Sequence, residues 1–204
     1  MNIMQNVDLA GFNTLAVPAR AAYFVEVTTL DELQEALAFS RQRNQAPVVL
    51  GGGSNVVLTG DIDGLVIRLA LRGVECSEHG DERLVTAAAG ENWHELVCYC
   101  IAQGCYGLEN LIAIPGSVGA APIQNIGAYG VELSKVLESV TGWDCEQSQL
   151  RTLSAEQCQL SYRDSIFKHE LKDRFIITSV CLRLSAIAHP EVSYPALRAE
   201  LSDP

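Results

Sequence analysis

Residues 51–55 of the chain, Gly-Gly-Gly-Ser-Asn, have the composition of a loop that binds anions through its backbone. Three consecutive glycines followed by a hydroxyl and an amide can present a row of N–H groups, which forms a nest for phosphate oxygens. The loop matches neither a P-loop nor the GxGxxG fingerprint, because no Gly-Lys-Ser/Thr occurs in it and no helical pattern follows it. A tight turn between two strands is the alternative interpretation.

Residues 114–130, IPGSVGAAPIQNIGAYG, contain small side chains almost throughout. Glycine permits positive φ and allows a ligand to approach the main chain, at an entropic cost on folding. Gln124 and Asn125, between the glycine pairs, offer hydrogen-bonding groups. A connector within a large domain is an equal alternative, but together with the 51–55 loop the segment indicates a bound dinucleotide of an unusual type.

A third candidate is the polar cluster at residues 161–169, SYRDSIFKH. Arg163 could bind a carboxylate or phosphate with two parallel hydrogen bonds, and Tyr162 could supply a hydroxyl. Composition alone favours the alternative of an exposed helix start, capped by Asp164 and Ser165, with Arg163 in a surface ion pair.

The elements that must position these residues follow from hydrophobic patterning. In the first 70 residues, Thr29 is predicted to cap a helix that ends near Arg41 and Arg43. Short apolar runs predict strands on both sides of the 51–55 loop. The expected strands of this small α/β unit are residues 23–27, 47–50, 56–58 and 64–71.

The rest of the chain predicts a second unit with a largely antiparallel sheet. An amphipathic helix is expected over residues 91–103, with Gly104 as its stop, and Ser154 and Gln157 fit a capping box that opens a short helix. The expected strands are residues 84–89, 136–143, 149–153 and 175–184. We therefore predict an α+β fold with domains at residues 1–72 and 73–204.

Composition restricts the function classes. The 204 residues carry a net charge of −11, which disfavours binding to nucleic acid or anionic membranes. Any anionic ligand must therefore be bound locally, by individual arginines and backbone amides. The seven cysteines contain no CxxC pair and only four histidines accompany them, so we expect reduced thiols and no metal site. The N-terminal residues lack a signal-peptide pattern, and a cytoplasmic protein is expected.

Four motifs together resemble one family. GGGSN at 51–55, AGENWHELV at 89–97, GLENLIAIPGSVGAAPIQNIGAYGVEL at 107–133 and SYRDSIFK at 161–168 are similar to UDP-N-acetylenolpyruvoylglucosamine reductases, the MurB family of peptidoglycan synthesis. The resemblance spans nearly the whole chain. It implies the two-subdomain FAD-binding fold of the superfamily typified by vanillyl-alcohol oxidase, without the substrate domain. It also implies roles in cell wall biogenesis, cell shape and cell division.

The resemblance implies FAD between the two subdomains and NADPH as hydride donor. FAD is expected to be noncovalent, because residues 51–55 contain neither His nor Cys. The implied cofactor-binding residues are Gly51, Gly52, Gly53, Ser54, Asn55, Ile114, Pro115, Gly116, Ser117, Gly119, Ala120, Gln124, Asn125, Gly127, Ala128 and Gly130.

For catalysis, the resemblance assigns Arg163 to the carboxylate of the enolpyruvyl sugar nucleotide, with Tyr162 and Tyr194 as further substrate-binding residues. The family's proton-donating serine motif and its C-terminal glutamate have no counterpart in these residues. Two alternatives stay open: a FAD-binding fragment without activity of its own, and another oxidoreductase of the same superfamily. A full-length protein is expected to be a monomer, whereas a fragment without its substrate domain would expose apolar surface and self-associate.

Overall fold

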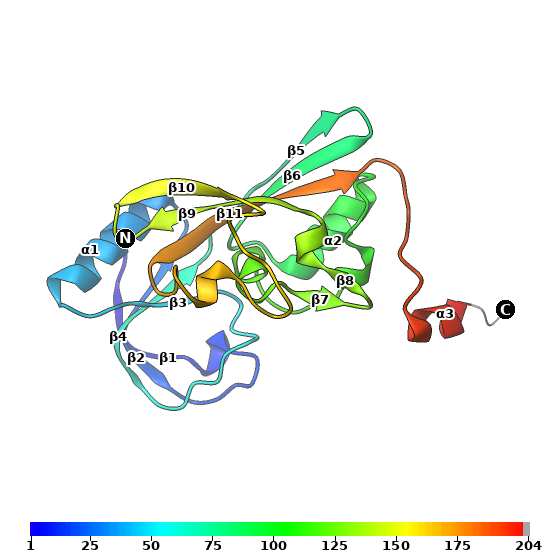
Figure 1. Cartoon of the computed structure of the whole chain (residues 1–204). Helices are drawn as coiled ribbons and strands as arrows, with labels where there is room; N and C mark the ends of the chain where they lie inside the picture. The colour runs from blue at the N-terminus through cyan, green and yellow to red at the C-terminus, as the bar shows by residue number, and fades with distance from the viewer. Residues whose placement is uncertain (202–204) are drawn as a thin grey trace.

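The structure is a computed structural model that describes residues 1–201, and it contains two β-sheets (Figure 1). The first sheet has the strand order β1-β2-β4-β3. Strand β2 pairs in parallel with β4, and so does β3, whereas β1 is antiparallel to β2. The strands are β1 (Met4–Asp8), β2 (Arg20–Val27), β3 (Val48–Leu50) and β4 (Ile62–Leu69).

Helix α1 (Leu30–Gln42) forms the crossover between the parallel strands β2 and β3. Its N-terminus is fixed by Thr29, whose side chain accepts a hydrogen bond from the Glu32 amide at 3.2 Å, as the sequence predicts. Leu33 and Leu37 are buried and pack in one cluster with residues of β2 and β4. Burying this apolar face is what holds the helix against the sheet, since isolated helices of this length are marginal in water.

The second sheet is antiparallel throughout, in the order β10-β9-β11-β6-β5. Helix α2 (Trp93–Ala102) begins after the capping residue Asn92, and Gly104 follows it with φ of +68°. The strands are β5 (Val74–His79), β6 (Glu82–Ala88), β9 (Leu137–Asp144), β10 (Gln149–Ser154) and β11 (Phe175–Ser185). The expectation of an α+β fold with a second antiparallel unit is confirmed.

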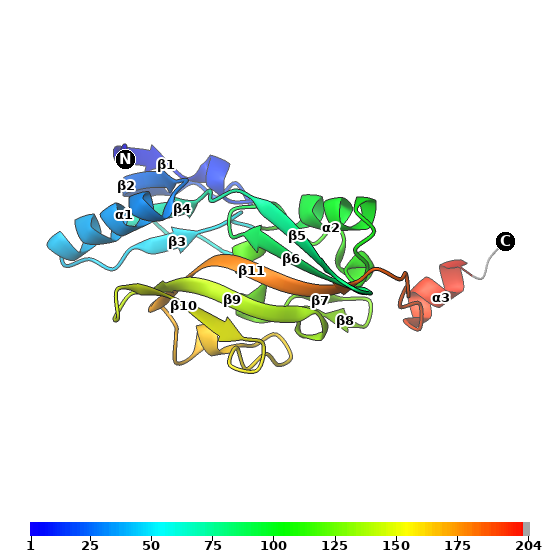
Figure 2. The ribbon, with the colours of Figure 1, turned by 90° about the horizontal axis from the view of Figure 1, so that it is seen from above.

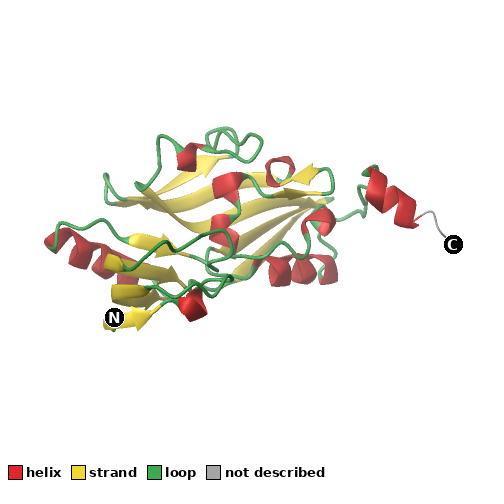
Figure 3. Ribbon diagram, turned by 90° about the horizontal axis from the view of Figure 1, so that it is seen from below, coloured by secondary structure: helices red, strands yellow, loops and turns green. Residues whose placement is uncertain are grey.

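The glycine-rich segment runs as a series of tight turns rather than as a regular element. It contains the two-stranded sheet of β7 (Gly127–Ala128) and β8 (Val131–Glu132). Four 3₁₀ turns lie in and beside it: Glu109–Leu111, Val118–Ala120, Pro122–Gln124 and Leu133–Lys135. Loops and short turns of this kind lie beside the strands of both sheets (Figure 3).

The two sheets share part of their core. Trp143 of β9 and Ile176 of β11 are buried in the same cluster as Leu33 and Leu37 of α1. The view from above shows α1 and β3 beside the ends of β9 and β11 (Figure 2). The first sheet is thereby joined to the second by apolar packing at this end.

Two sequence-based expectations are wrong. Residues 56–58 are not a strand: Val56 and Val57 are exposed and pair with no neighbouring strand in the structure. Ser154 and Gln157 do exchange capping-box hydrogen bonds, at 2.9 and 3.3 Å, but the chain forms turns there instead of a helix. Strands β1 and β5 were not predicted, because both are polar edge strands without an apolar alternation.

The last described element, α3 (Pro195–Leu201), lies apart from both sheets in Figures 1 and 2 and buries none of its residues. An irregular segment connects it to β11. Within residues 1–201, none of the helices has the length and apolar character needed to cross a membrane.

Candidate functional site

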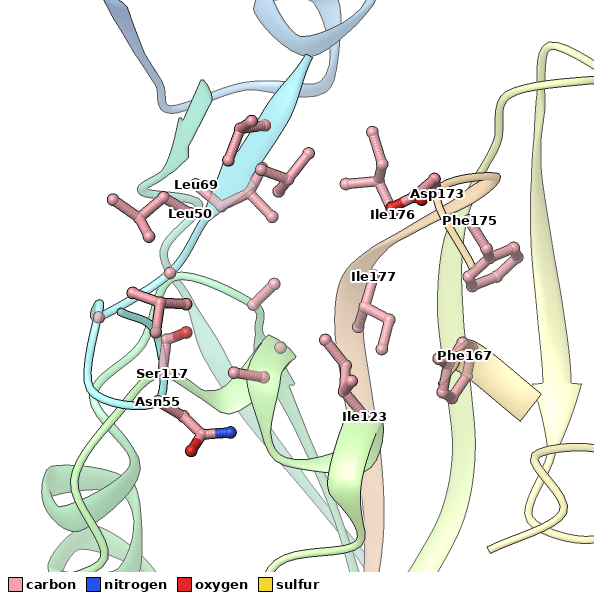
Figure 4. A pocket seen from close by; sticks show the side chains of 18 of the residues that line it. Leu50, Asn55, Leu69, Ser117, Ile123, Phe167, Asp173, Phe175, Ile176 and Ile177 are labelled. Atoms are coloured by element: carbon pink, nitrogen blue, oxygen red, sulfur yellow. The ribbon is translucent and has the colours of Figure 1, made fainter. Parts of the chain in front are cut away.

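A cavity of about 1010 Å³ lies between the two sheets. One wall is formed by the end of β3, the following loop 51–55 and Leu69 of β4, and the opposite wall by the start of β11 (Figure 4). Leu50 and Leu69 face Ile176 and Ile177 across the opening. The size is at the upper end of the range for small-molecule sites, which suits a large ligand.

Glycine allows the 51–55 loop to pack backbone against backbone on residues 115–117. A Cβ on Gly52 would lie 3.1 Å from the Gly116 Cα, and one on Gly51 would lie 2.2 Å from the Ser117 Oγ. Gly53 has φ of +65°, and a Cβ there would lie 2.1 Å from the Phe12 carbonyl oxygen. Position 53 therefore requires glycine, for close packing and for a left-handed turn, whereas a side chain at Gly51 or Gly52 would first have to displace Ser117 or Gly116.

Two side-chain hydrogen bonds connect the same two segments. The Ser54 hydroxyl donates to the Pro115 carbonyl at 3.1 Å, and the Asn55 amide donates to the Gln124 Oε1 at 2.9 Å. The loop and the first half of the glycine-rich segment therefore form one continuous wall, although they are about 60 to 70 residues apart in sequence.

The backbone of this wall keeps donors free for a ligand. Among the hydrogen bonds of residues 1–201, none is donated by the N–H groups of Gly53, Ser54 or Asn55. Three consecutive amides without acceptors at the edge of a cavity are compatible with the anion nest that the sequence predicts as one possibility. The loop does make a turn, but it is followed by irregular chain and not by a strand.

The charges around the cavity favour an anionic ligand locally, in spite of the acidic chain. The charged residues of the lining are Arg41, Lys168, Lys172 and Asp173. This gives the lining an excess of positive charge, which favours an anionic ligand in the cavity. These cations were not predicted as site residues, because their place in the lining depends on how α1 and the segment before β11 pack around the cavity.

The remaining lining is mostly apolar, which suits a flat ring system. Phe167, Phe175 and Ile177 form the far wall, and Ile123 lies at its base (Figure 4). The Ser40 hydroxyl, which also lines the cavity, is buried and has no hydrogen-bond partner. A buried hydroxyl without a partner is costly unless a ligand or water supplies one.

The structure separates the sixteen cofactor residues implied by the resemblance into two groups. Those of the loop 51–55, together with Ile114, Pro115, Gly116, Ser117, Gly119, Ala120 and Gln124, line the cavity. The other four, which belong to the second half of the glycine-rich segment, are absent from the lining: Asn125, Gly127, Ala128 and Gly130.

The polar side-chain atoms of Asn125 are all hydrogen-bonded within the protein. It is 1% exposed and has φ of +43°. Its amide nitrogen donates to Glu132 at 2.9 Å and to the Ser161 carbonyl at 3.0 Å, and its oxygen accepts from the Ser134 amide at 2.9 Å. Its side chain thus connects the glycine-rich segment to the cluster at 161–169.

Arg163 lies outside the cavity lining, on a tight turn closed by reciprocal hydrogen bonds between the backbones of Ser161 and Asp164. It has φ of +55°, and its guanidinium donates to the Gly127 carbonyl at 3.0 Å rather than forming the expected surface ion pair. Asp164 is instead hydrogen-bonded to the His169 ring, at 2.7 Å. Ser165 caps the following 3₁₀ turn, as predicted.

Two other tyrosines form a small aromatic surface near Gly127. The rings of Tyr129 and Tyr194 meet edge to face at 5.6 Å, and Asn110 donates to the carbonyls of both Tyr129 and Glu191. Tyr162 is 82% exposed. Tyr129, which the sequence analysis did not single out, thus belongs with Tyr194 at the surface that also contains Gly130.

Comparison with known proteins identifies a matching family and several relatives. Residues 21–153 match the family described as FAD binding domain. The chain is 47% identical to the UDP-N-acetylenolpyruvoylglucosamine reductase of Dechloromonas aromatica over 99% of its length, and 51% identical to that of Cupriavidus pinatubonensis over 93%. It spans 60% and 56% of these two relatives.

Solved structures show the same fold. The reductase (MurB) of Thermus caldophilus aligns with a TM-score of 0.73 and 28% identity, over 98% of this chain and 68% of that one. Cholesterol oxidase from B. sterolicum aligns with a TM-score of 0.61 over 90% of this chain and 36% of that one. Its identity is 14%, so this second likeness concerns the fold alone.

Proposed function

Because the chain belongs to the FAD-binding domain family, we propose that it is the flavin-binding part of a UDP-N-acetylenolpyruvoylglucosamine reductase. This oxidoreductase would act in peptidoglycan synthesis in the cytoplasm, with NADPH as hydride donor. The observation that supports the proposal most directly is the wall formed by loop 51–55 and residues 114–124, where free amides lie beside an apolar slot.

The residues present fit FAD. When bound, this cofactor supplies hydride transfer between NADPH and the enolpyruvyl group. The amides of Gly53, Ser54 and Asn55 would hold its pyrophosphate, with Lys168, Lys172 and Arg41 supplying positive charge. The apolar walls would exclude water from the flavin ring.

Binding is proposed to be noncovalent. Residues 51–55 contain no nucleophile that attaches flavin, and Cys145 is the one cysteine of the described chain in the cavity lining. Burial, together with the charge of Asp144, raises the pKa of the Cys145 thiol and keeps it protonated. A protonated thiol is a poor nucleophile.

Arg163 is the proposed catalytic residue. Charge develops on the substrate carboxylate during reduction, and a fixed guanidinium next to it stabilises that charge. The tight turn and the hydrogen bond to Gly127 fix the position of Arg163, and Tyr162 and Tyr194 are proposed as substrate contacts on the same surface.

We propose a division into two FAD-binding subdomains at residues 1–72 and 73–204. Strand β4 of the first sheet ends at Leu69 and β5 of the second begins at Val74. The full-length protein is proposed to be a monomer and the present chain to self-associate, which size-exclusion chromatography would measure.

The test is to purify the chain with FAD and measure bound flavin by absorbance. NADPH oxidation dependent on the enolpyruvyl sugar nucleotide is then measured, with Arg163→Lys as the variant. Turnover that falls by about 10²–10³ in the variant, with flavin retained, supports the reductase. A colourless chain that cannot be reconstituted with FAD contradicts the proposal.

A second candidate is a FAD-binding module without independent turnover. It is favoured by the exposure of Tyr162, whose ring no described part of the chain covers. Stoichiometric flavin without substrate-dependent NADPH oxidation would support this candidate and exclude the first for residues 1–204.

A further inference from the structure

Two cysteines from different elements meet at the edge of the second sheet. Cys76 is exposed on the edge strand β5, in the hairpin that projects from the molecule in Figure 1. Cys105 is buried just after the end of α2. Their sulfur atoms are 3.7 Å apart. This pair is remote from the cavity, and neither residue is in its lining.

The spacing is close to that of a disulfide. The sulfurs would have to approach by roughly 1.7 Å to reach bonding distance. Cys76 can supply this movement, because β5 pairs only with β6 and its other side is free. Within residues 1–201, the Cys105 sulfur has one hydrogen-bond partner apart from Cys76, the Gln103 carbonyl at 3.8 Å, so no strong bond among the described residues resists a shift.

The two thiols differ in accessibility. Cys76 is the one that a dissolved oxidant can reach. Burial and the neighbouring Cys76 raise the pKa of Cys105 to about 11, although Arg83 opposes the rise and Glu78 adds to it. Cys105 is therefore protected from direct oxidation and reacts only with a partner that is already beside it.

We propose that Cys76 and Cys105 form a reversible oxidation site, which hydrogen peroxide converts to a disulfide. Peroxide first transfers an oxygen atom to the Cys76 sulfur, giving a sulfenic acid and one water. The Cys105 sulfur then displaces the hydroxyl group, which leaves with the Cys105 proton as a second water. In total, two thiols are oxidised, one peroxide is reduced, and one disulfide forms.

The bond would connect the β5–β6 hairpin to the C-terminal end of α2. The opposite end of α2 reaches the cavity: the Trp93 amide donates to the Gly116 carbonyl at 3.0 Å, and Trp93 is part of the lining. Because the disulfide closes a loop of about thirty residues in the unfolded chain, Tm should rise by roughly 5–10 °C. This inference does not depend on the proposed reductase activity.

The experiment treats the reduced, purified chain with hydrogen peroxide at equimolar amounts and counts free thiols under denaturing conditions. The expected result is a loss of two of the seven thiols, restored by dithiothreitol. Trypsin releases Cys76 in the peptide 73–83, which contains no other cysteine. Fragment-ion sequencing should find this peptide bonded to Cys105.

The variant Cys76→Ser removes the exposed partner, so its fold should be retained while the thiol loss and the Tm increase disappear. Cys98→Ser is the matched control, since Cys98 is also exposed but lies next to His94 instead of a cysteine, and it should behave like the parent. The proposal is overturned if all seven thiols persist, if the bond joins other cysteines, or if Cys76→Ser loses the same two thiols.

Discussion

The loop 51–55 and the residues 125–130 both combine glycines with one asparagine, yet they use them differently. In the loop, the Asn55 side chain lines the cavity, three backbone amides have no acceptor within the described chain, and glycine permits close contact with residues 115–117. In residues 125–130, the one amide side chain is buried and bonded to the protein on every side. Glycine content alone therefore does not distinguish a wall that binds a ligand from a turn that supports that wall.

The distinction lies in the hydrogen bonds. A segment that leaves backbone donors unpaired at a cavity is prepared for a ligand, whereas a buried side chain such as that of Asn125, whose donors and acceptor are all paired with the protein, contributes rigidity. Three of the four predictions that follow test this contrast, and the fourth concerns the neighbouring cluster 161–169; they are ordered from the largest expected effect to the smallest.

Gly53→Ala should lower both the stability of the fold and the affinity of the loop for FAD. The new Cβ would lie 2.1 Å from the Phe12 carbonyl, at a φ of +65° that alanine disfavours. We expect a loss of about 3 kcal/mol in unfolding free energy and a clear weakening of FAD binding, measured by urea denaturation and flavin fluorescence. Gly60→Ala is the control, because a Cβ there meets no atom within 4 Å. Equal stability of the two variants would contradict the close packing described for the loop.

Asn125→Ala should act mainly on stability. The substitution removes three buried hydrogen bonds and leaves the Ser134 amide and the Ser161 carbonyl without their partner. A loss of about 2–3 kcal/mol is expected. FAD affinity, measured well below the denaturation midpoint, should fall less than the stability does. A variant of normal stability that no longer binds FAD would reverse the assignment of residues 125–130.

Gln124→Ala is the variant to compare with Asn125→Ala, because it removes the neighbouring amide side chain. Gln124 lines the cavity, and its one described hydrogen bond is with Asn55. Unfolding free energy should change by less than about 0.5 kcal/mol, while the Kd for FAD rises about 3- to 10-fold. Isothermal titration provides the affinity. If Gln124→Ala proves less stable than Asn125→Ala, the division of the segment at residue 125 is wrong.

The smallest effect is expected at Asp164. The hydrogen bond from His169 lowers the pKa of this carboxyl below its ordinary value of 3.8. A lowered folded-state pKa stabilises the fold above the unfolded value, and this contribution disappears as the pH falls through the folded-state value. Asp164→Asn should therefore lower Tm by roughly 1–3 °C at pH 7 and not at pH 2, in scanning calorimetry. A difference that grows at acid pH would contradict this assignment.

Much of the fold was predictable from local patterns. The capped helix α1, the amphipathic helix α2 and the long apolar strands β9 and β11 all bury a regular apolar face. Strand β5 could not be found in this way, because five of its six residues are exposed at a sheet edge. The predicted strand at residues 56–58 is wrong for the opposite reason. These apolar residues have high β-propensity, but no neighbouring strand pairs with them.

The site was predictable only where it is continuous in sequence. The loop 51–55 carries its own backbone signature, and the four motifs supplied the family. The far wall at Phe175–Ile177 and the cation Lys172 carry no local signal, because their place at the cavity depends on how β11 packs against α1. Lys168 lies in a recognised motif, but nothing in that motif places it at the cavity. The unequal roles of Gln124 and Asn125, adjacent amides in one motif, required the structure.

The hydrogen bonds Ser54–Pro115 and Asn55–Gln124 also constrain the order of events during synthesis. The first wall of the cavity leaves the ribosome more than sixty residues before its partner, and the opposite wall follows with β11. A nascent chain that ends before residue 177 thus lacks a complete cavity, whatever local structure it has formed. Flavin can therefore bind a nascent chain only after both walls of the cavity have folded together. Once bound, it would stabilise the folded chain relative to the unfolded chain by mass action.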